Sequence, residues 1–452
     1  MRAEGKGSRR RRPLARGALA LLALYMAAGY LTTALRRVET EVPPVPTTTL
    51  PALEGILLTG VFSVHTDRSH DARGTREQVA AAGARGGLDF VVVGDHPPSP
   101  RKPGWEFWDP VFLQGVLVEG GQELRAPEAG KLLVMGVDTT YRHWEESYDS
   151  MVSMLARRGA TSLVVHGRGP RRSERWVHPT VTGVQGWEVL DVSEFARHRL
   201  RSPWGPYHLI TALVGFPLGM GDKALLHLMR EGFDTPTVAA YDSLRMGQPL
   251  VATAGLNVHP KLAVGPFLLP PYRPFFTTMV CHLAAPGPLS PDPDEASAGL
   301  AELVREGDLF IALGRHERAR AFRLGAVLGS EVVARMGRDT LALEGVVLRA
   351  GFEGEAPPRL VYRILRNGSE VAWLRGADLE WAPPGEGFYR VEVYTYGARL
   401  GNTFFRLRPW IFANPMGLVG AGDGTEETDG LVEAGDGTEE TDGLVGAGDW
   451  TR

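Results

Sequence analysis

The chain has 452 residues, of which 43% are hydrophobic and 23% charged, with a formal net charge of −4. These values are ordinary for a globular protein and exclude a fully disordered chain, a collagen and a polytopic membrane protein. The near-neutral charge gives no basic field of the kind that indicates nucleic-acid binding, so no nucleic-acid partner is expected. The single cysteine, Cys281, excludes an intramolecular disulfide and a cysteine-based zinc site.

The N-terminal segment has the pattern of a single-pass membrane anchor. Residues 1–16 are rich in arginine, and residues 17–35 carry no charge. Arg36 and Arg37 follow this uncharged run. As a helix this uncharged run would span roughly 28 Å, about the thickness of a bilayer's hydrocarbon core. We therefore expect an uncleaved transmembrane helix, a basic cytoplasmic N-terminus and a globular part on the periplasmic side. A cleaved signal peptide, whose apolar core is usually shorter, and a buried soluble helix are the alternatives.

After a Pro- and Thr-rich linker (residues 36–54), the region 55–321 alternates apolar runs with helical stretches. The patterns predict a helix over 75–85 that begins at Thr75, and a helix over 145–158. Two helical pieces within 209–229 are separated at Pro217 and Gly219. Apolar runs predict strands over 88–93, 132–136, 162–165, 187–191 and 250–254, the last ending before Gly255. This alternation predicts an α/β layer or barrel.

The pattern changes in residues 322–416, which predict a small antiparallel β-sandwich of roughly 90 residues. Strand-like runs cover 340–348, 360–365, 371–374 and 389–396. Asn367-Gly368 lies between two of them and is a strong hairpin signal. We expect this module to pack on the preceding domain or to bind a protein partner, which the sequence does not identify.

Residues 417–452 form an acidic tail that repeats a segment with a period of 13 residues. The tail lacks the apolar content of a core and is predicted to be disordered. The spacing of its aspartates does not match an EF-hand loop, which leaves a duplication without function as the simpler interpretation.

Polar residues stand at the ends of the predicted strands in the α/β region. They are His65, Asp95, His96, Glu123, His166 and His259, with His70 and Asp71 close to the first of them. Strand ends carry the sites of α/β barrels, and imidazole and carboxylate groups are ligands for zinc, manganese or iron. The set therefore predicts a metal site, although any one of these histidines alone would more often be structural.

The order of these residues resembles the PHP (polymerase and histidinol phosphatase) domain family over residues 55 to about 320. Six family motifs, H-x-H-x-x-x-S-[DH], T-D-H, G-x-E, G-H, H-P and D-x-H, correspond in this order to Ser63–Asp71, Gly94–His96, Gly121–Glu123, Gly130-Lys131, His166-Gly167 and Asn257–His259. The resemblance implies a distorted (β/α)7 TIM-like barrel and metal-dependent hydrolysis of phosphoesters with up to three metal ions.

Three positions depart from the family pattern: Ser63, Lys131 and Asn257. By the resemblance, the first metal would keep only His65 and Glu123, and the second would meet the ammonium group of Lys131, which repels a cation. The third would keep Asp71 (or His70), His96 and His259. We therefore expect one divalent ion, with Lys131 beside Glu123 as a tethered cation in place of a second ion.

The leading interpretation is thus a membrane-anchored phosphoesterase acting on a phosphorylated small molecule or another phosphoester. Its predicted metal ligands are His65, His70, Asp71, His96, Glu123, His166 and His259, and its predicted catalytic residues are Glu123, His166 and Asp95. A catalytically inactive PHP-like protein that serves as an extracytoplasmic binding or scaffold module is the alternative. An amidohydrolase-like barrel is a third interpretation, against which Ser63 counts because that family usually keeps H-x-H after its first strand.

Several further residues have two interpretations. Arg168, Arg171 and Arg172 follow His166 and suit either phosphate binding or a solvated loop. Glu188 and Asp191 suit either metal ligation or the orientation of ligands. The aromatic residues of the loop after His96 could line a pocket, but we expect them to pack; they are Trp105, Phe107 and Trp108.

Overall fold

The protein is described by a computed structural model that covers residues 11–419, apart from short internal segments. The segments outside the described residues are 46–47, 51–54, 99–108, 138, 142–146, 170–174, 179–180, 217, 230–231, 266, 315 and 342–343. Several sequence predictions lie there: the basic residues 1–10, the Trp105–Trp108 loop, Arg171 and Arg172, and the acidic tail beyond residue 419.

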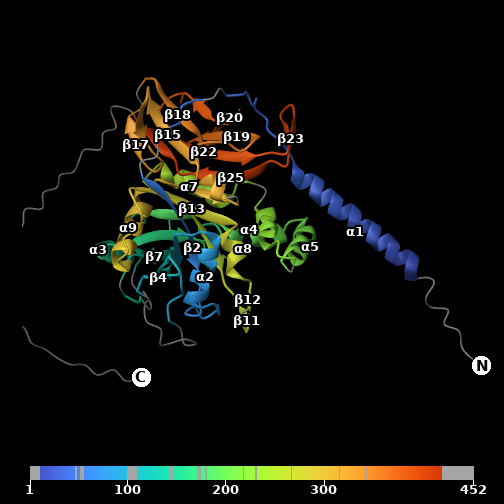
Figure 1. The fold of residues 1–452 in the computed structure, drawn as a ribbon, viewed down its shortest axis with the longest axis horizontal. Helices are drawn as coiled ribbons and strands as arrows, with labels where there is room; N and C mark the ends of the chain where they lie inside the picture. Colours follow the sequence, from blue (N-terminus) through green and yellow to red (C-terminus); the bar gives the residue numbers. More distant parts are fainter. Residues whose placement is uncertain are drawn as a thin grey trace, which may run out of the picture.

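A large mixed sheet lies at the centre of the fold, flanked by helices (Figure 1). Its strands in the α/β part are β2 (Ile56–Val64), β3 (Phe90–Val93), β4 (Val111–Leu113), β5 (Val116–Glu119), β6 (Gln122–Ala126), β7 (Gly130–Met135), β8 (Thr161–Val165), β9 (Gly186–Asp191), β10 (Val251–Val258), β13 (Met279–Ala285) and β14 (Leu309–Leu313). Strand β2 pairs in parallel with β3 and β10, and β10 continues through β9 to β8. Antiparallel β7 and β6 follow, and a bridge between Asp95 and Gln122 leads back to β3. The mixed α/β fold expected from the sequence is confirmed.

Burial explains why these strands read as continuous apolar runs. Every residue of β3, β5, β8, β9 and β10 is buried, as expected for parallel strands covered on both faces. One boundary was wrong: the strand predicted over 250–254 continues through Gly255 to Val258, because Gly255 and Val258 pair with Phe62 and Val64 of β2. Glycine marks a close contact here, not the end of the strand.

Helices cover the sheet, and one of them begins at the cap predicted from the sequence. They are α2 (Arg76–Gly86), α3 (Tyr148–Arg157), α4 (Val192–Leu200), α5 (Gly205–Gly215), α6 (Gly221–Leu228), α7 (Pro236–Arg245), α8 (Tyr272–Phe276), α9 (Pro293–Glu306) and α10 (His316–Ala319). Helix α2 begins as predicted after Thr75, whose side chain accepts from the N–H of Gln78 in a capping box. The two pieces predicted within 209–229 are α5 and α6.

A short hairpin between the α/β strand β10 and helix α8 stands out from the surface. It consists of β11 (Leu262–Val264) and β12 (Phe267–Leu269), which pair antiparallel, and it begins three residues after His259. The side chains of Leu262, Val264 and Phe267 are exposed to solvent. The hairpin therefore presents an apolar surface close to a predicted site residue.

From Phe322 to Val419 every regular element of the described chain is a strand. The strands are β15 (Phe322–Leu328), β16 (Glu331–Ala334), β17 (Asp339–Leu341), β18 (Val346–Phe352), β19 (Leu360–Arg366), β20 (Ser369–Arg375), β21 (Leu379–Trp381), β22 (Gly387–Thr395), β23 (Ala398–Leu400), β24 (Thr403–Phe405), β25 (Arg408–Ala413) and β26 (Met416–Val419). One sheet has the order β16-β15-β18-β21, and the other contains β20, β19, β22, β25 and β26. The hairpin predicted at Asn367-Gly368 is confirmed, with both residues at positive φ.

The β-strand part differs from the prediction in two respects. The run predicted as one strand over 340–348 is two strands, β17 and β18, which pair in different sheets. Strand β25 also pairs with β14 of the α/β part, so the two parts share one continuous sheet.

The side chain of Asn414 links the two parts of the chain at this junction through hydrogen bonds. Its Nδ2 donates to the carbonyl oxygens of Ala252 (2.9 Å) and Leu309 (3.1 Å), and its Oδ1 accepts from the N–H of Ala252 (2.7 Å). The side chain is fully buried. We expect Asn414→Ala to lower the free energy of unfolding by about 2 kcal/mol, because these backbone groups lose their partner without gaining water. Urea unfolding followed by circular dichroism measures the change, with Asn402→Ala as the control, and equal stability of the two variants would contradict it.

The buried carboxyl group of Glu119, at the end of β5, makes the stability of the folded state depend on pH. Burial raises its pKa from 4.5 to about 7, although Gly136 N–H donates to it. In the unfolded chain Glu119 ionises near its ordinary pKa, so the folded state loses stability as the pH rises from about 4.5 to 7.

We therefore expect Glu119→Gln, which stays neutral, to be more stable than the wild type at pH 8 by up to about 3 kcal/mol. At pH 5 the difference shrinks to below about 1 kcal/mol, because the wild-type group is then also largely neutral in the folded state. Guanidinium unfolding at both pH values tests this, with exposed Glu331→Gln as the control. A difference that is independent of pH would disprove the assignment.

The N-terminal helix α1 (Arg11–Ala34) projects from the body (Figure 1). At its base Tyr25 packs against Trp204, with ring centroids 5.2 Å apart, and the Tyr25 hydroxyl donates to the carbonyl of Pro203. None of the described helices combines the length and the hydropathy needed to cross a bilayer. The membrane anchor stays a prediction.

The described part of residues 36–54 does not hang free, as a tether would. Strand β1 (Leu35–Arg37) pairs with β24, and Val38 and Val42 are buried. The backbone of residues 43–45 exchanges hydrogen bonds with Arg375 of β20. This segment therefore fixes the base of α1 against the β-strand part.

Candidate metal centre

Three histidines from the ends of three strands converge. His65 follows β2, His96 follows β3 and His259 follows β10, and one ring nitrogen of each lies within 4.8 Å of the others. The rings of His65 and His259 stack with centroids 3.8 Å apart, and those of His65 and His96 are 4.7 Å apart. The expectation that these strand ends bring imidazoles together is confirmed.

Two carboxylates complete the cluster. Asp71 lies 3.7 Å from His96 Nε2 and 3.6 Å from His259 Nε2, and Glu123 lies 3.5 Å from His65 Nε2 and 3.6 Å from His96 Nδ1. These separations exceed hydrogen-bond length and are close to the edge, about 3.4 Å, of a tetrahedron with metal–ligand bonds of about 2.1 Å.

The hydrogen bonds around the cluster point lone pairs inward. His259 Nδ1 donates to the carbonyl of Asn257 (2.9 Å), and His65 Nδ1 is 3.2 Å from Ser69 Oγ, so the Nε2 atom of each ring carries the free lone pair. His65 Nε2 and Asp71 Oδ1 are buried and have no hydrogen-bond partner. The ligand atoms that all lie within 4.8 Å of one another are those of the three histidines, and Asp71 borders two of them. Unpaired buried acceptors beside such a cluster fit a divalent cation, and the N/O donor set suits zinc, manganese or iron.

Asp95 lies behind this cluster and does not face it. Its carboxylate accepts from the Thr66 N–H (2.7 Å), the Thr66 hydroxyl and the Ser69 hydroxyl (2.7 Å). Since Ser69 in turn contacts His65, Asp95 acts as a positioning residue, which differs from the predicted catalytic role. His70 is exposed, with its ring centroid 5.1 Å from that of His96, and is not one of the three converging histidines.

Lys131 makes the contact expected from the sequence. Its Nζ lies 2.5 Å from Glu123 Oε1, and the Glu123 side chain is almost wholly buried. Burial alone would raise the pKa of Glu123, but His96, His65 and Lys131 together lower it well below its usual range. The Lys131 ammonium group thus places a positive charge beside the Glu123 carboxylate, which also faces three histidines.

A second buried group adjoins the first at the ends of β8 and β9. His166 Nδ1 is 2.8 Å from Asp191 Oδ2, and its Nε2 is 3.8 Å from Glu123 Oε2. Although burial lowers the pKa of His166, Asp191 raises it further, to about 10. One ligand atom each of His166, Glu188 and Asp191 lies within 4.8 Å of the others, so this buried group is a second place that could hold a metal ion.

The sequence analysis singled out Glu188 of β9 but not its two hydrogen-bond partners. The Ser63 hydroxyl donates to Glu188 Oε1 (2.6 Å), and Asn257 Nδ2 donates to Oε2 (3.0 Å). Burial raises the pKa of Glu188 to about 8. A Cβ at Gly255 would lie 1.5 Å from Glu188 Oε1, so the glycine makes room for this carboxyl. Two of the three residues that depart from the PHP pattern, Ser63 and Asn257, are therefore hydrogen-bonded to one buried acid.

Unusual backbone conformation marks the ends of strands β2, β8 and β10. Ser63, His166 and Asn257 have φ values of 59°, 55° and 46°, in the left-handed region that non-glycine residues rarely adopt. Such strain clusters at functional sites and persists only where the surrounding structure enforces it. The signal that identified Glu188 in the sequence is its position as an acidic residue inside the otherwise apolar run Trp187–Leu190 of β9.

A cavity of about 260 Å³ is lined by Asp191, the hydrogen-bond partner of His166. Its polar lining also includes Arg168, Arg175, Glu194 and Thr237. Arg168, for which the sequence allowed either phosphate binding or a solvated loop, thus lies beside a space that could accept a substrate group.

The fold has likenesses among solved structures, whereas the sequence searches find none. No protein family and no curated protein matches the sequence. A solved structure from Bacteroides vulgatus, of a two-domain protein containing a predicted PHP-like metal-dependent phosphoesterase, aligns with 84% of this chain and 99% of its own. The sequence identity is 12% and the TM-score is 0.39. Functional inference must therefore come from the residues of this chain.

Proposed function

We propose that this protein is a PHP-like metal-dependent phosphoesterase with one divalent metal ion. The supporting observation is the convergence of His65, His96 and His259, with the Asp71 carboxylate beside the last two and a partnerless lone pair on His65 Nε2. These four residues would hold the ion, and Glu123 would border it. When bound, such an ion supplies Lewis-acid chemistry to a phosphoester.

The chain's own residues would perform the remaining tasks. Lys131, held by Glu123, and Arg168, at the neighbouring cavity, would attract and orient a phosphate group. Asp191 holds the Nδ1 proton of His166, so His166 can donate a proton from Nε2 to a leaving-group oxygen. The proposed substrates are phosphorylated small molecules or other phosphoesters.

The proposal includes the organisation of the chain. Residues 55–321 would form a distorted (β/α)7 barrel of the PHP type, and residues 322–416 a β-sandwich module with a protein partner still to be identified. The segment 17–35 would anchor the protein in a membrane with the globular part on the periplasmic side.

A binding module without turnover is the second candidate, and two observations favour it. Lys131 is a cation where the PHP resemblance implies a metal ligand, and the Glu188 carboxyl is hydrogen-bonded to both Ser63 and Asn257. Two-metal clamps stabilise both the attacking and the leaving oxygens, and a one-ion site lacks that clamp.

Metal analysis separates these candidates. The full chain, purified in detergent without chelator and supplied with Zn²⁺, Mn²⁺ or Fe²⁺, is expected to hold about one ion by ICP-MS. We expect His259→Ala to lose that ion, because the variant removes one of the converging ligands, and His178→Ala to keep it. Turnover of p-nitrophenyl phosphate that disappears in His259→Ala would support the enzyme. One bound ion without turnover on any phosphoester favours the binding module, and no bound ion would refute the metal site.

A further inference from the structure

Two adjoining hollows lie where α1 meets the body. The first, of about 330 Å³, is a mainly apolar groove between α1, α5 and α6. It is lined by Met26, Ile210, Thr211, Val214, Gly215, Met220, Lys223 and Ala224. Lys223 is the one charged residue of this lining and lies at the end shared with the second hollow.

The second hollow, of about 370 Å³, lies between α5, α6 and the β-strand part. Its charged residues are Lys223, Arg406 and Arg408, and its lining also includes His227, Tyr30, Tyr207 and Trp410. No carboxylate occurs among the described residues that line it. Since Thr211 and Lys223 belong to both hollows, an apolar groove leads directly into a cationic pocket.

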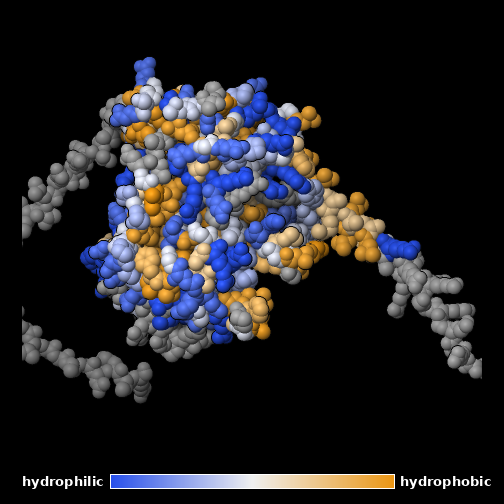
Figure 2. Space-filling view, in the orientation of Figure 1, coloured by the Kyte–Doolittle hydropathy of each residue, from blue (hydrophilic) through white to orange (hydrophobic). Residues whose placement is uncertain are grey.

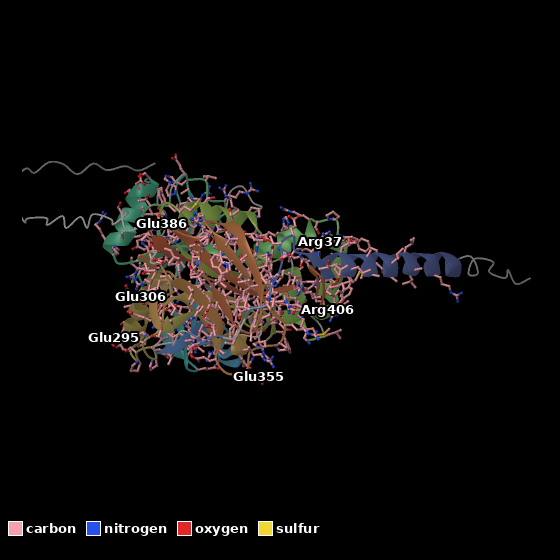
Figure 3. All side chains as sticks on the ribbon, turned by 90° about the horizontal axis from the view of Figure 1, so that it is seen from above. Arg37, Glu295, Glu306, Glu355, Glu386 and Arg406 are labelled. Carbon is pink, nitrogen blue, oxygen red and sulfur yellow. The ribbon has the colours of Figure 1, made fainter. Side chains whose placement is uncertain are left out.

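The two hollows together, the compound site, lie beside the base of α1 and next to exposed apolar surface. Arg406 lies beside the base of α1, as Figure 3 shows, and its Nε donates to the Tyr30 hydroxyl at 2.8 Å. Segment 205–220 contains no Asp, Glu, Lys or Arg, and Leu213 and Val214 on it are more than half exposed. Figure 2 shows α1 as a continuous hydrophobic surface that leaves the body here. The groove thus opens onto apolar surface, while the pocket is positively charged.

We propose that this compound site binds one anionic phospholipid. An acyl chain would lie in the groove along Ile210, Val214 and Met220, and the phosphate headgroup would lie among Lys223, Arg406 and Arg408. Guanidinium groups bind phosphate through paired charge-assisted hydrogen bonds, and the groove removes apolar surface from water. The absence of carboxylates from the described lining favours an anionic headgroup over a zwitterionic one. This inference does not depend on the proposed phosphoesterase activity.

Native mass spectrometry and thermal unfolding of the full chain in detergent test the proposal. The probes are dioleoylphosphatidylglycerol, dioleoylphosphatidylcholine with the same chains, and inorganic phosphate. We expect phosphatidylglycerol to bind at least ten-fold more tightly than phosphatidylcholine. Phosphate, which lacks the chains, is expected to give no thermal shift at millimolar concentration.

Variants at each end of the site make the test specific. Lys223→Gln and Val214→Asp should each weaken phosphatidylglycerol binding at least ten-fold, and both positions are exposed, so folding is expected to survive. Arg338→Gln and Leu400→Asp, at exposed positions outside the site, should bind like the wild type. Equal binding of the two lipids, or no effect of the Lys223 and Val214 variants, would overturn the proposal. Tight phosphate binding that survives Val214→Asp would also overturn it, in favour of a soluble anion.

Discussion

Lys131→Met is expected to lower the free energy of unfolding by about 4 kcal/mol in the absence of metal, because breaking a buried ion pair leaves one charge uncompensated. Glu123 Oε1 lies 2.5 Å from Lys131 Nζ, and only 3% of Glu123 is exposed. The histidines that also face Glu123 are 3.5–3.8 Å from it, too far for strong hydrogen bonds. Urea unfolding in EDTA measures the loss.

The matched control is Lys261→Met, which removes an exposed lysine that follows His259 closely in the chain. It should change stability by less than about 0.5 kcal/mol. Lys131→His restores the residue type that the PHP resemblance implies and is expected to raise the metal content from one ion towards two. An unchanged unfolding free energy in Lys131→Met would show that Glu123 is neutral or solvated.

Gly255→Ala is expected to destabilise the fold by about 4 kcal/mol, through overpacking and the loss of buried hydrogen bonds. The added Cβ would lie 1.5 Å from Glu188 Oε1 and 1.9 Å from Glu188 Cδ. The carboxyl would have to leave Ser63 and Asn257, which donate to it, and no solvent lies at hand because all these groups are buried. Guanidinium unfolding measures the effect.

A double-mutant cycle isolates the cause. In a Glu188→Ala background the alanine at 255 has room, so the two changes should couple by at least about 2 kcal/mol. Gly299→Ala serves as the control, because its added Cβ meets nothing within 4 Å on helix α9. A Gly255→Ala penalty that is the same with and without Glu188 would disprove the role assigned to this carboxyl.

The strand-end histidines were predictable because buried parallel strands read as apolar runs, and the residue after each run stands out. His65 and His96 follow this rule, whereas the run predicted before His259 ended too early, at Ala254. Lys131 beside Glu123 followed from the PHP resemblance. The contact of Ser63 and Asn257 with Glu188 was not predictable, since it depends on side chains from three strands that meet across the interior.

The errors share a physical origin. Gly255 was interpreted as a strand end because glycine usually interrupts strands, whereas here it accommodates a neighbour's side chain. Asp95 was predicted to be catalytic as a polar residue at a strand end, whereas its carboxylate is hydrogen-bonded to Thr66 and Ser69. Neither outcome can be derived from local sequence, because both depend on packing between strands.

The Glu188 carboxyl also constrains the order in which substitutions can accumulate at this centre. Asn257→Asp alone would place an acid in contact with Glu188, itself near Asp191 and His166, in a buried space. Burial already raises the pKa of Glu188, and a second buried carboxyl in contact with it would lower the stability of the fold further. Aspartate at 257 would therefore be tolerated better once Glu188 has been replaced, and Gly255 could then be exchanged for a larger residue. The three positions thus depend on one another in the order in which they can change.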